Sequence, residues 1–264
     1  MNILVCIKPV PDPEKYGELK IDMDTKRLIR EGIPSVVNPS DRNALEEALK
    51  LREKSGGKVT VLSMAPEFTR DKLTECLAMG ADEAFLLSDA AFGGADTYAT
   101  SYVLAKAIER LGAFDLILFG NESADGATAH VPVQVAEWLS LPHLCRVVEI
   151  TEEDPGFRVC RKGDGGRLVF AIGKPCVLAV SSGINKPRFI NAMGIIKAKK
   201  KPLTVWSNED LGLDMDRIGL QGSPTQPGEL ITPHMERSSE ILGTDPEEAA
   251  DKIIALMKKA GGTL

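Results

Sequence analysis

Aromatic residues are scarce in this chain, where Phe, Trp and Tyr make up 5% of the 264 residues. The scarcity argues against broad stacking surfaces for bases or sugars and leaves the core to aliphatic side chains. No CxxC pair is present, because the five cysteines are scattered at Cys6, Cys76, Cys145, Cys160 and Cys176. The three histidines share no helical spacing, so the sequence predicts neither a disulfide framework nor a metal site.

Long hydrophobic runs are also missing. No stretch reaches the roughly 18–20 apolar residues that a membrane-spanning helix needs, and residues 1–12 lack the basic start and cleavage site of a signal peptide. Lys and Arg number 32 against 38 Asp and Glu, a net charge of −6. This balance argues against a nucleic-acid binder, and we interpret the basic run Lys197–Lys201 as a solvated or partner-facing strip. The sequence predicts a cytoplasmic globular protein.

Short apolar runs alternate with longer helical patterns over the first 145 residues. Strand-like runs cover residues 2–8, 59–64, 83–87 and 116–119. Helical patterns cover residues 41–55, 69–79 and 97–111. Ser40 is the expected N-cap of the first helix, and Gly80 and Gly112 are expected to end the other two. The alternation predicts an α/β, Rossmann-like parallel sheet with helices on both faces.

The rhythm changes after residue 145. Four strand-like runs follow one another at 146–150, 157–161, 167–172 and 176–180, separated in two places by hairpin-forming residues. They predict an antiparallel extension of the sheet over about 146–180, or a small β subdomain. We expect residues 1–200 to form the nucleotide-binding domain. Residues 201–264, with a last helix at Pro246–Lys259, are expected to form an arm that wraps a partner, with disorder as the alternative.

The loop GNESADGATAH, residues 120–130, gives the strongest local signal of a binding site. It follows a strand and leads into a helical pattern, and Gly120 and Gly126 allow tight turns and close approach of a ligand to the backbone. Amides at the helix start and the hydroxyls of Ser123 and Thr128 can receive a phosphate or pyrophosphate. The loop is neither a Walker A motif nor a GxGxxG fingerprint.

Simpler interpretations of these residues stay open. Asp125 and Thr128 can merely cap the helix that follows the loop, and the same holds for DTYAT, residues 96–100, at an earlier helix entry. His130 can bind a ligand or can have a surface or capping role. No GxSxG, HExxH or recognisable pair of catalytic carboxylates occurs, so the sequence predicts no catalytic residue.

Several longer motifs occur together along the chain. They are VCIKPVPD, IREGIPSVVNPSDRNALEEALKLRE, LAMGADEAFLLSD, LILFGNESADGATAHVPVQVAEWLSLP, RKGDGGRLVFAIGKPCVLAV and INKPRFINAMGIIKAKKKP. In these motifs the sequence closely resembles the beta subunit of electron transfer flavoproteins, and the resemblance covers essentially the whole chain.

This resemblance implies a heterodimer with an FAD-carrying alpha subunit, in which the present chain holds an adenine nucleotide. In one branch of the family that nucleotide is structural AMP, and in the electron-bifurcating branch it is a second FAD that takes a hydride from NADH. One electron then goes to a low-potential ferredoxin or flavodoxin, and the other goes through the alpha-subunit FAD to an acyl-CoA dehydrogenase-type partner. The segments GGADTYATSYVLAKAI, DGATAHV and GLQGSPT are similar to the bifurcating branch and favour FAD over AMP.

Carried over position by position, the resemblance implies a cofactor site. Its residues are Cys6, Asn38, Pro39, Ser40, Asp41, Met64, Asp96, Thr97, Thr100, Gly120, Asn121, Glu122, Ser123, Asp125, Gly126, Ala127, Thr128, Ala129, His130 and Val131. Within this set, Cys6 is expected near the adenine and residues 120–131 around the phosphates. The family's partner-recognition loop corresponds to Pro187–Ile196, with Ala192 at the usual anchor position and Met193 as a substitute anchor.

The chain departs from the family pattern at four positions of the loop region. Glu122 and His130 stand where Gln is typical, Ala127 where bifurcating members have Asp, and Pro132 where Gly is typical. From another class, a universal-stress-type regulatory module on a similar sheet would be a homodimer without use for a C-terminal arm. A nucleotide-alpha-hydrolase enzyme would need an SGGxD-like loop, which is missing.

Overall fold

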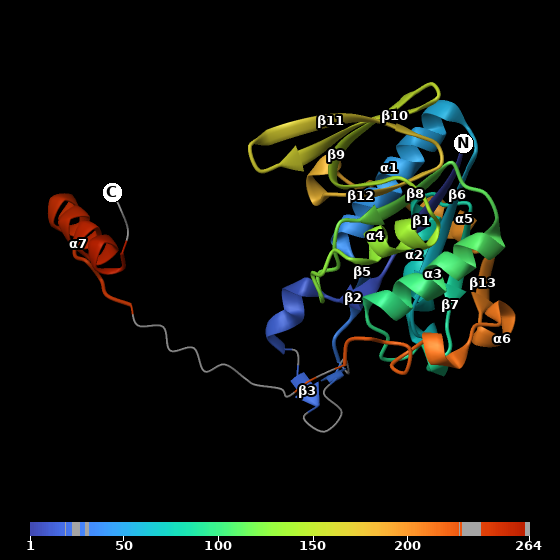
Figure 1. Ribbon diagram of the computed structural model, residues 1–264, viewed down its shortest axis with the longest axis horizontal. Helices are drawn as coiled ribbons and strands as arrows, with labels where there is room; N and C mark the ends of the chain where they lie inside the picture. Colours follow the sequence, from blue (N-terminus) through green and yellow to red (C-terminus); the bar gives the residue numbers. More distant parts are fainter. Residues whose placement is uncertain (19, 23–26, 30–31, 227, 229–238, 262–264) are drawn as a thin grey trace. The chain divides into compact units, whose positions relative to one another are not determined.

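A nine-stranded sheet organises most of the chain (Figure 1). The computed structural model describes residues 1–18, 20–22, 27–29, 32–226, 228 and 239–261. The sheet has the order β11-β10-β9-β12-β8-β1-β6-β7-β13. Its parallel strands are β1 (Asn2–Cys6), β6 (Lys58–Met64), β7 (Glu83–Leu87), β8 (Leu116–Gly120), β12 (Cys176–Val180) and β13 (Leu203–Trp206). The predicted Rossmann-like α/β class is confirmed.

Helices cover both faces of this sheet. Apolar residues of α1 (Pro39–Ser55) and α2 (Arg70–Met79) share one core cluster with α5 (Ala192–Ala198). Those of α3 (Thr97–Leu111) and α4 (Val131–Trp138) form a second cluster. Smaller elements are α6 (Asn208–Leu211), the pair β2 (Pro9–Pro11) and β5 (Ser35–Val37), and the pair β3 (Lys20–Asp22) and β4 (Arg27–Ile29).

The ends of three helices test the sequence-based expectations directly. Gly80 and Gly112 end α2 and α3 with φ values of 142° and 106°, as predicted. The expectation that Ser40 caps α1 is wrong, because the N-cap is Asn38 and its side chain makes no cap hydrogen bond. Pro39 occupies the first turn, where its missing N–H costs nothing. The side chains at this helix start are instead used in contacts with another loop, described below.

The antiparallel extension is confirmed for three strands and wrong for the fourth. β9 (His143–Glu153), β10 (Gly156–Gly163) and β11 (Gly166–Gly173) form an antiparallel meander. In contrast, β12 lies between β9 and β8 and runs parallel to both. All five of its residues are buried, which is typical of a strand inside a parallel sheet that is covered on both faces.

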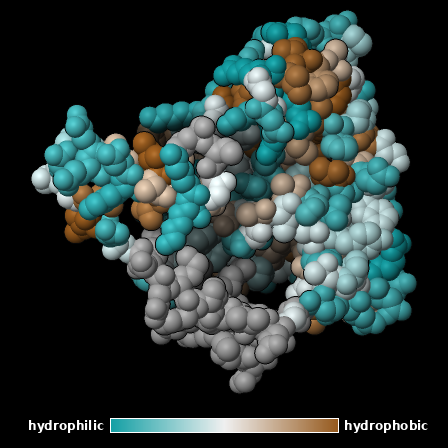
Figure 2. Space-filling view, turned by 60° about the vertical axis from the view of Figure 1, so that its left-hand side comes forward, coloured by the Kyte–Doolittle hydropathy of each residue, from teal (hydrophilic) through white to brown (hydrophobic). Residues whose placement is uncertain are grey.

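The edge strand β11 exposes apolar side chains. Leu168, Val169 and Phe170 are all exposed, with Val169 at 58%. Figure 2 shows apolar patches on the upper part of the surface, the height at which Figure 1 places these strands. None of these residues contributes to the core of the described chain.

The sheet continues past the expected domain boundary at residue 200. β13 pairs with β7 through Leu203–Trp206, and the chain separates into two compact units, Met1–Gly228 and Glu229–Leu264. The last helix, α7 (Pro246–Lys259), has the predicted bounds. Its apolar residues Ile253, Ile254, Leu256 and Met257 are exposed. Contact of residues 201–264 with a partner stays a prediction.

The strand order reverses its direction at β1, so the switch point of the sheet lies between β1 and β8. From β1 the chain proceeds outward to β6 and β7, then crosses back to β8 on the other side of β1. Ligands of open α/β sheets bind at such a switch point, beyond the carboxyl ends of the strands.

No helix of the described residues is long and apolar enough to cross a membrane.

Candidate functional site

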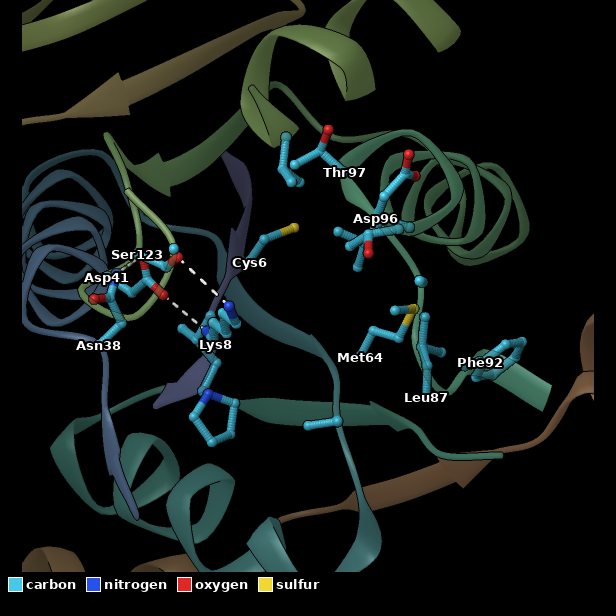
Figure 3. A pocket seen from close by; sticks show the side chains of 18 of the residues that line it. Cys6, Lys8, Asn38, Asp41, Met64, Leu87, Phe92, Asp96, Thr97 and Ser123 are labelled. Atoms are coloured by element: carbon cyan, nitrogen blue, oxygen red, sulfur yellow. Dashed lines mark hydrogen bonds between the residues drawn. The ribbon is translucent and has the colours of Figure 1, made fainter. Parts of the chain in front are cut away.

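A cavity of about 1030 Å³ opens at the carboxyl ends of β1, β6, β7 and β8. It is lined by the residues that follow each of these strands, so segments far apart in the sequence meet at one edge of the sheet. Figure 3 shows a polar side formed by Lys8, Asp41 and Ser123. Met64, Leu87 and Phe92 form an apolar side opposite them.

The start of α1 fixes the loop that follows β8. The Asn38 side chain donates to the Glu122 carbonyl at 3.0 Å and accepts from the Ala124 N–H at 3.0 Å. The Ser40 hydroxyl donates to the same Glu122 carbonyl at 2.8 Å. These contacts join α1 to a loop that lies more than 80 positions later in the sequence. They hold the loop in place without the help of a ligand.

Asp41 links the ends of the two central strands. Its carboxylate accepts from the backbone N–H of Lys8 at 2.7 Å and of Gly120 at 3.1 Å, and from the Asn38 amide at 3.0 Å. Burial raises the pKa of Asp41 from 3.8 to about 7, although these hydrogen bonds favour the charged form. The neighbouring Cys6 thiol also has a raised pKa, because of burial first and of Asp41 second.

The loop backbone adopts an unusual conformation at two alanines. Ala127 and Ala129 have φ values of 48° and 55°, in the left-handed region, and Ala129 is followed by the right-handed His130. Successive residues of opposite hand point their N–H groups into one concavity that binds anions. Strain at non-glycine residues is typical of binding sites, and this geometry supports the phosphate interpretation of the loop.

The alternative that Asp125 or Thr128 caps α4 is wrong. The N-cap is His130, and its side chain makes no cap hydrogen bond. Asp125 instead accepts from the Lys8 ammonium at 2.6 Å. The corresponding alternative for Asp96 is confirmed, because its carboxylate accepts from the Ala99 N–H at 3.0 Å and caps α3.

Asp96 also connects the cavity wall to the C-terminal part of the first unit. Its second carboxylate oxygen accepts from the Thr225 N–H at 2.9 Å, and its own N–H donates to the Ser223 hydroxyl at 2.8 Å. Burial alone would raise the pKa of Asp96, but the backbone donors from Ala99, Thr225 and Tyr98 together lower it. Asp96, with Thr97 and Thr100, therefore presents a charged and hydroxyl-rich wall.

Replacing Ser223 by alanine should loosen this wall. The buried hydroxyl accepts from the Asp96 N–H and donates to the Gly219 carbonyl at 2.6 Å. Its loss leaves both groups without this partner, which costs about 1–3 kcal/mol. Urea unfolding of Ser223→Ala should show that loss, while Ser181→Ala, whose side chain caps nothing, should change the free energy of unfolding little. Equal losses in both variants would contradict this role.

Most of the residues predicted for the site line the cavity. They are Cys6, Asn38, Asp41, Met64, Asp96, Thr97, Thr100, Gly120, Glu122, Ser123, Gly126, Thr128, Ala129, His130 and Val131. Five predicted residues do not line it, namely Pro39, Ser40, Asn121, Asp125 and Ala127. Ser40 and Asp125 act on its neighbours, and the Asn121 side chain accepts from the Arg146 N–H at 2.9 Å. Ala192 and Met193 lie on α5, outside the lining residues.

The site set implied by the resemblance leaves out several lining residues, above all Lys8, Leu87 and Phe92. Lys8 and Phe92 lie in loops that leave the carboxyl ends of β1 and β7, and Leu87 is the last residue of β7, so their positions at strand ends indicate the site. No three His, Cys, Asp or Glu side chains of the described residues gather as a metal site.

Comparisons with known proteins identify the family. An Electron transfer flavoprotein domain matches residues 25–211. An electron transfer flavoprotein subunit beta from Thermoanaerobacterium thermosaccharolyticum is 45% identical over 96% of both chains. The chain belongs to the electron transfer flavoprotein beta-subunit family. The family match favours this assignment over a universal-stress-type module and over a nucleotide-alpha-hydrolase enzyme.

Other relatives of this electron transfer flavoprotein beta subunit are named as parts of larger complexes. The caffeyl-CoA reductase–Etf complex subunit CarD of Acetobacterium woodii is 43% identical over 98% of both chains. The acryloyl-CoA reductase electron transfer subunit gamma of Anaerotignum propionicum is 37% identical over 98% of this chain and 99% of its own. Both names describe subunits that act with a CoA-ester reductase.

Proposed function

We propose that this beta subunit binds FAD in the cavity, pairs with an alpha subunit and takes part in electron bifurcation. In this proposal NADH is the electron donor. The electrons go to a low-potential ferredoxin or flavodoxin and, through the alpha-subunit FAD, to an acyl-CoA dehydrogenase-type partner. The relatives named for CoA-ester reductases support a partner of that type.

The observation that carries the choice of FAD is the size and the two-sided lining of the cavity. Its volume of about 1030 Å³ lies at the upper end of the roughly 300–1,000 Å³ typical of ligand sites. AMP would need the phosphate loop and an adenine site, but it would leave the apolar side of Met64, Leu87 and Phe92 unfilled (Figure 3). A flavin ring is flat, and its dimethylbenzene part is apolar and suits such a side.

The donors of the cavity fit a dinucleotide. Backbone N–H groups around Ala129 suit phosphates, and the hydroxyls of Thr97 and Thr100 suit a ribityl or ribose group. When bound, FAD itself supplies the redox chemistry, and the chain supplies position, charge and exclusion of water. A chain that only positions FAD needs no acid–base residues, which agrees with the lack of acid–base motifs in the sequence.

Partner contact through the segment around α5 is supported by exposure. Met193 is 59% exposed and Phe189 is 87% exposed. Arg188 anchors the segment, because its guanidinium bonds to Glu46 at 2.8 Å and to Glu53 at 2.6 Å on α1. The apolar side chains are therefore presented from a fixed base.

The nucleotide content of the purified alpha/beta complex tests the proposal. We expect two flavins per heterodimer in the absorption spectrum and no AMP among the nucleotides released by denaturation. One flavin with one AMP per heterodimer would overturn the FAD assignment and with it bifurcation. A chain that forms a stable homodimer and binds no alpha subunit would overturn the heterodimer.

A further inference from the structure

Lys8 is a cation in an otherwise acidic part of the cavity. Among the described residues that line the cavity, only Lys8 has a lysine or arginine side chain. Asp41, Glu67, Asp89, Asp96 and Glu122 line the same cavity. Backbone donors lower the pKa values of Asp89 and Asp96, which keeps both carboxylates charged. Among the described lining residues, an anionic ligand therefore meets several carboxylates that repel it and one lysine side chain that attracts it.

A hydrogen bond fixes the backbone of Lys8, from which its side chain extends. Its backbone N–H donates to the buried Asp41 carboxylate at 2.7 Å, two residues beyond the end of β1. The ammonium reaches across to the loop after β8, where it donates to Asp125 at 2.6 Å. It also donates to the Ser123 hydroxyl at 3.4 Å (Figure 3). Lys8 thus joins the two central strand ends at the loop proposed to hold phosphates.

The Lys8–Asp125 pair is unequal in exposure. The Lys8 side chain is 46% exposed, whereas that of Asp125 is 7% exposed. The ammonium therefore faces the cavity while its counterion lies behind it in the loop. A phosphate that enters the cavity can approach Lys8 from the open side and compete with Asp125 for its N–H donors.

We infer that Lys8 is the side chain that compensates the phosphate charge, and that Asp125 holds the Lys8 ammonium before the ligand binds and competes with the ligand for it. This inference rests on the proposed function, because it assumes that the cavity binds an adenine nucleotide. It makes Lys8 a specificity residue for phosphorylated ligands. Asp125 lowers the apparent affinity, because the ligand must displace it from the ammonium.

Titration of the full chain with ADP and with adenosine tests this inference. ADP carries the diphosphate that FAD also has, and adenosine carries none, so the ratio of their association constants isolates the phosphate contact. Lys8→Met should lower this ratio at least about tenfold, the scale of one hydrogen bond to a charged group. Asp125→Asn should raise it, because the ammonium is then no longer held by a carboxylate.

Lys58→Met is the matched control. Lys58 is 50% exposed and pairs with Glu83 at 2.7 Å, and it does not line the cavity. Its loss changes the net charge as the loss of Lys8 does, so the ratio should stay within about twofold of the unmodified chain.

The outcomes separate the inference from the proposed function. If ADP and adenosine bind but Lys8→Met leaves their ratio unchanged, the role of Lys8 is overturned and the nucleotide site stands. If Asp125→Asn lowers the ratio, the competition between Asp125 and phosphate is overturned. If neither ligand binds the unmodified chain, the inference fails, and the nucleotide content of the alpha/beta complex decides the proposed function separately.

Discussion

Alanine in place of Gly120 should abolish nucleotide binding and lower the free energy of unfolding by about 3 kcal/mol, the upper end of the cost of overpacking. Gly120 ends β8 directly beneath the loop. A Cβ atom at this position would lie 2.2 Å from the Ser40 hydroxyl and 2.3 Å from the Asp41 carboxylate. Either the start of α1 or the strand end must move, and both positions fix the loop.

The damage extends beyond the clash itself. Moving Asp41 breaks its bond to the Gly120 N–H at 3.1 Å and disturbs its bond to the Lys8 N–H. Moving Ser40 breaks its bond to the Glu122 carbonyl. The loop would then lose the contacts that organise it before binding, and preorganised donors account for much of the affinity of such sites.

Gly173→Ala is the control for this variant. Gly173 also ends a strand, β11, and a Cβ atom there would meet no atom within 4 Å. Urea unfolding and ADP titration of both variants give the comparison. If Gly120→Ala bound ADP as the unmodified chain does, the packing of α1 against the strand end would not control the loop.

Gly120 also illustrates what the sequence could and could not predict. The local sequence predicts the strand, its last glycine and the loop that follows, and the structure has the loop at this strand end. Gly120 lines the cavity, so close approach of a ligand to its backbone stays a prediction, and the start of α1 packs closely against it from the other side. Which group fills the space beside a glycine depends on tertiary packing, which local patterns do not contain.

The same distinction explains the other outcomes. Ser40 has the chemistry of an N-cap, but its hydroxyl is used for the Glu122 carbonyl, because a tertiary contact competes with capping. β12 follows antiparallel strands in sequence and still inserts as a parallel strand beside β8. The alternation of apolar residues predicts which side chains of a strand are buried, but it does not predict which strand lies beside it. Lys8 lies in the motif VCIKPVPD, but its contact with Asp125, 117 positions away, depends on the fold and not on that motif.

Stability should depend on pH through Asp41. Its pKa is raised from 3.8 to about 7 in the folded chain, chiefly by burial. Between these values the folded chain binds a proton that the unfolded chain releases. The contribution to stability is therefore complete below pH 3.8 and is lost as the pH rises through 7. The difference corresponds to about 4 kcal/mol, at roughly 1.4 kcal/mol for each pKa unit.

Asp41→Asn removes this titration. We expect the difference in the free energy of unfolding between the unmodified chain and Asp41→Asn to fall steadily from pH 4 to pH 7, and to be flat above about pH 8. Urea unfolding at several pH values measures this difference. The asparagine variant is also expected to be less stable at low pH, because its NH₂ group cannot accept from both Lys8 and Gly120.

Asp89→Asn should give the opposite slope and so serves as the control. Backbone N–H groups of Ala91 and Asn208 lower the pKa of Asp89, so its contribution is present above the ordinary pKa and is lost as the pH falls. If both variants changed stability with the same slope, the pH dependence would not arise at the individual carboxylates. If only Asp41→Asn showed the falling difference, proton uptake beneath the loop would be established.

Because a charged Asp41 adds repulsion under the proposed phosphate site, ADP affinity should then weaken over the same pH range.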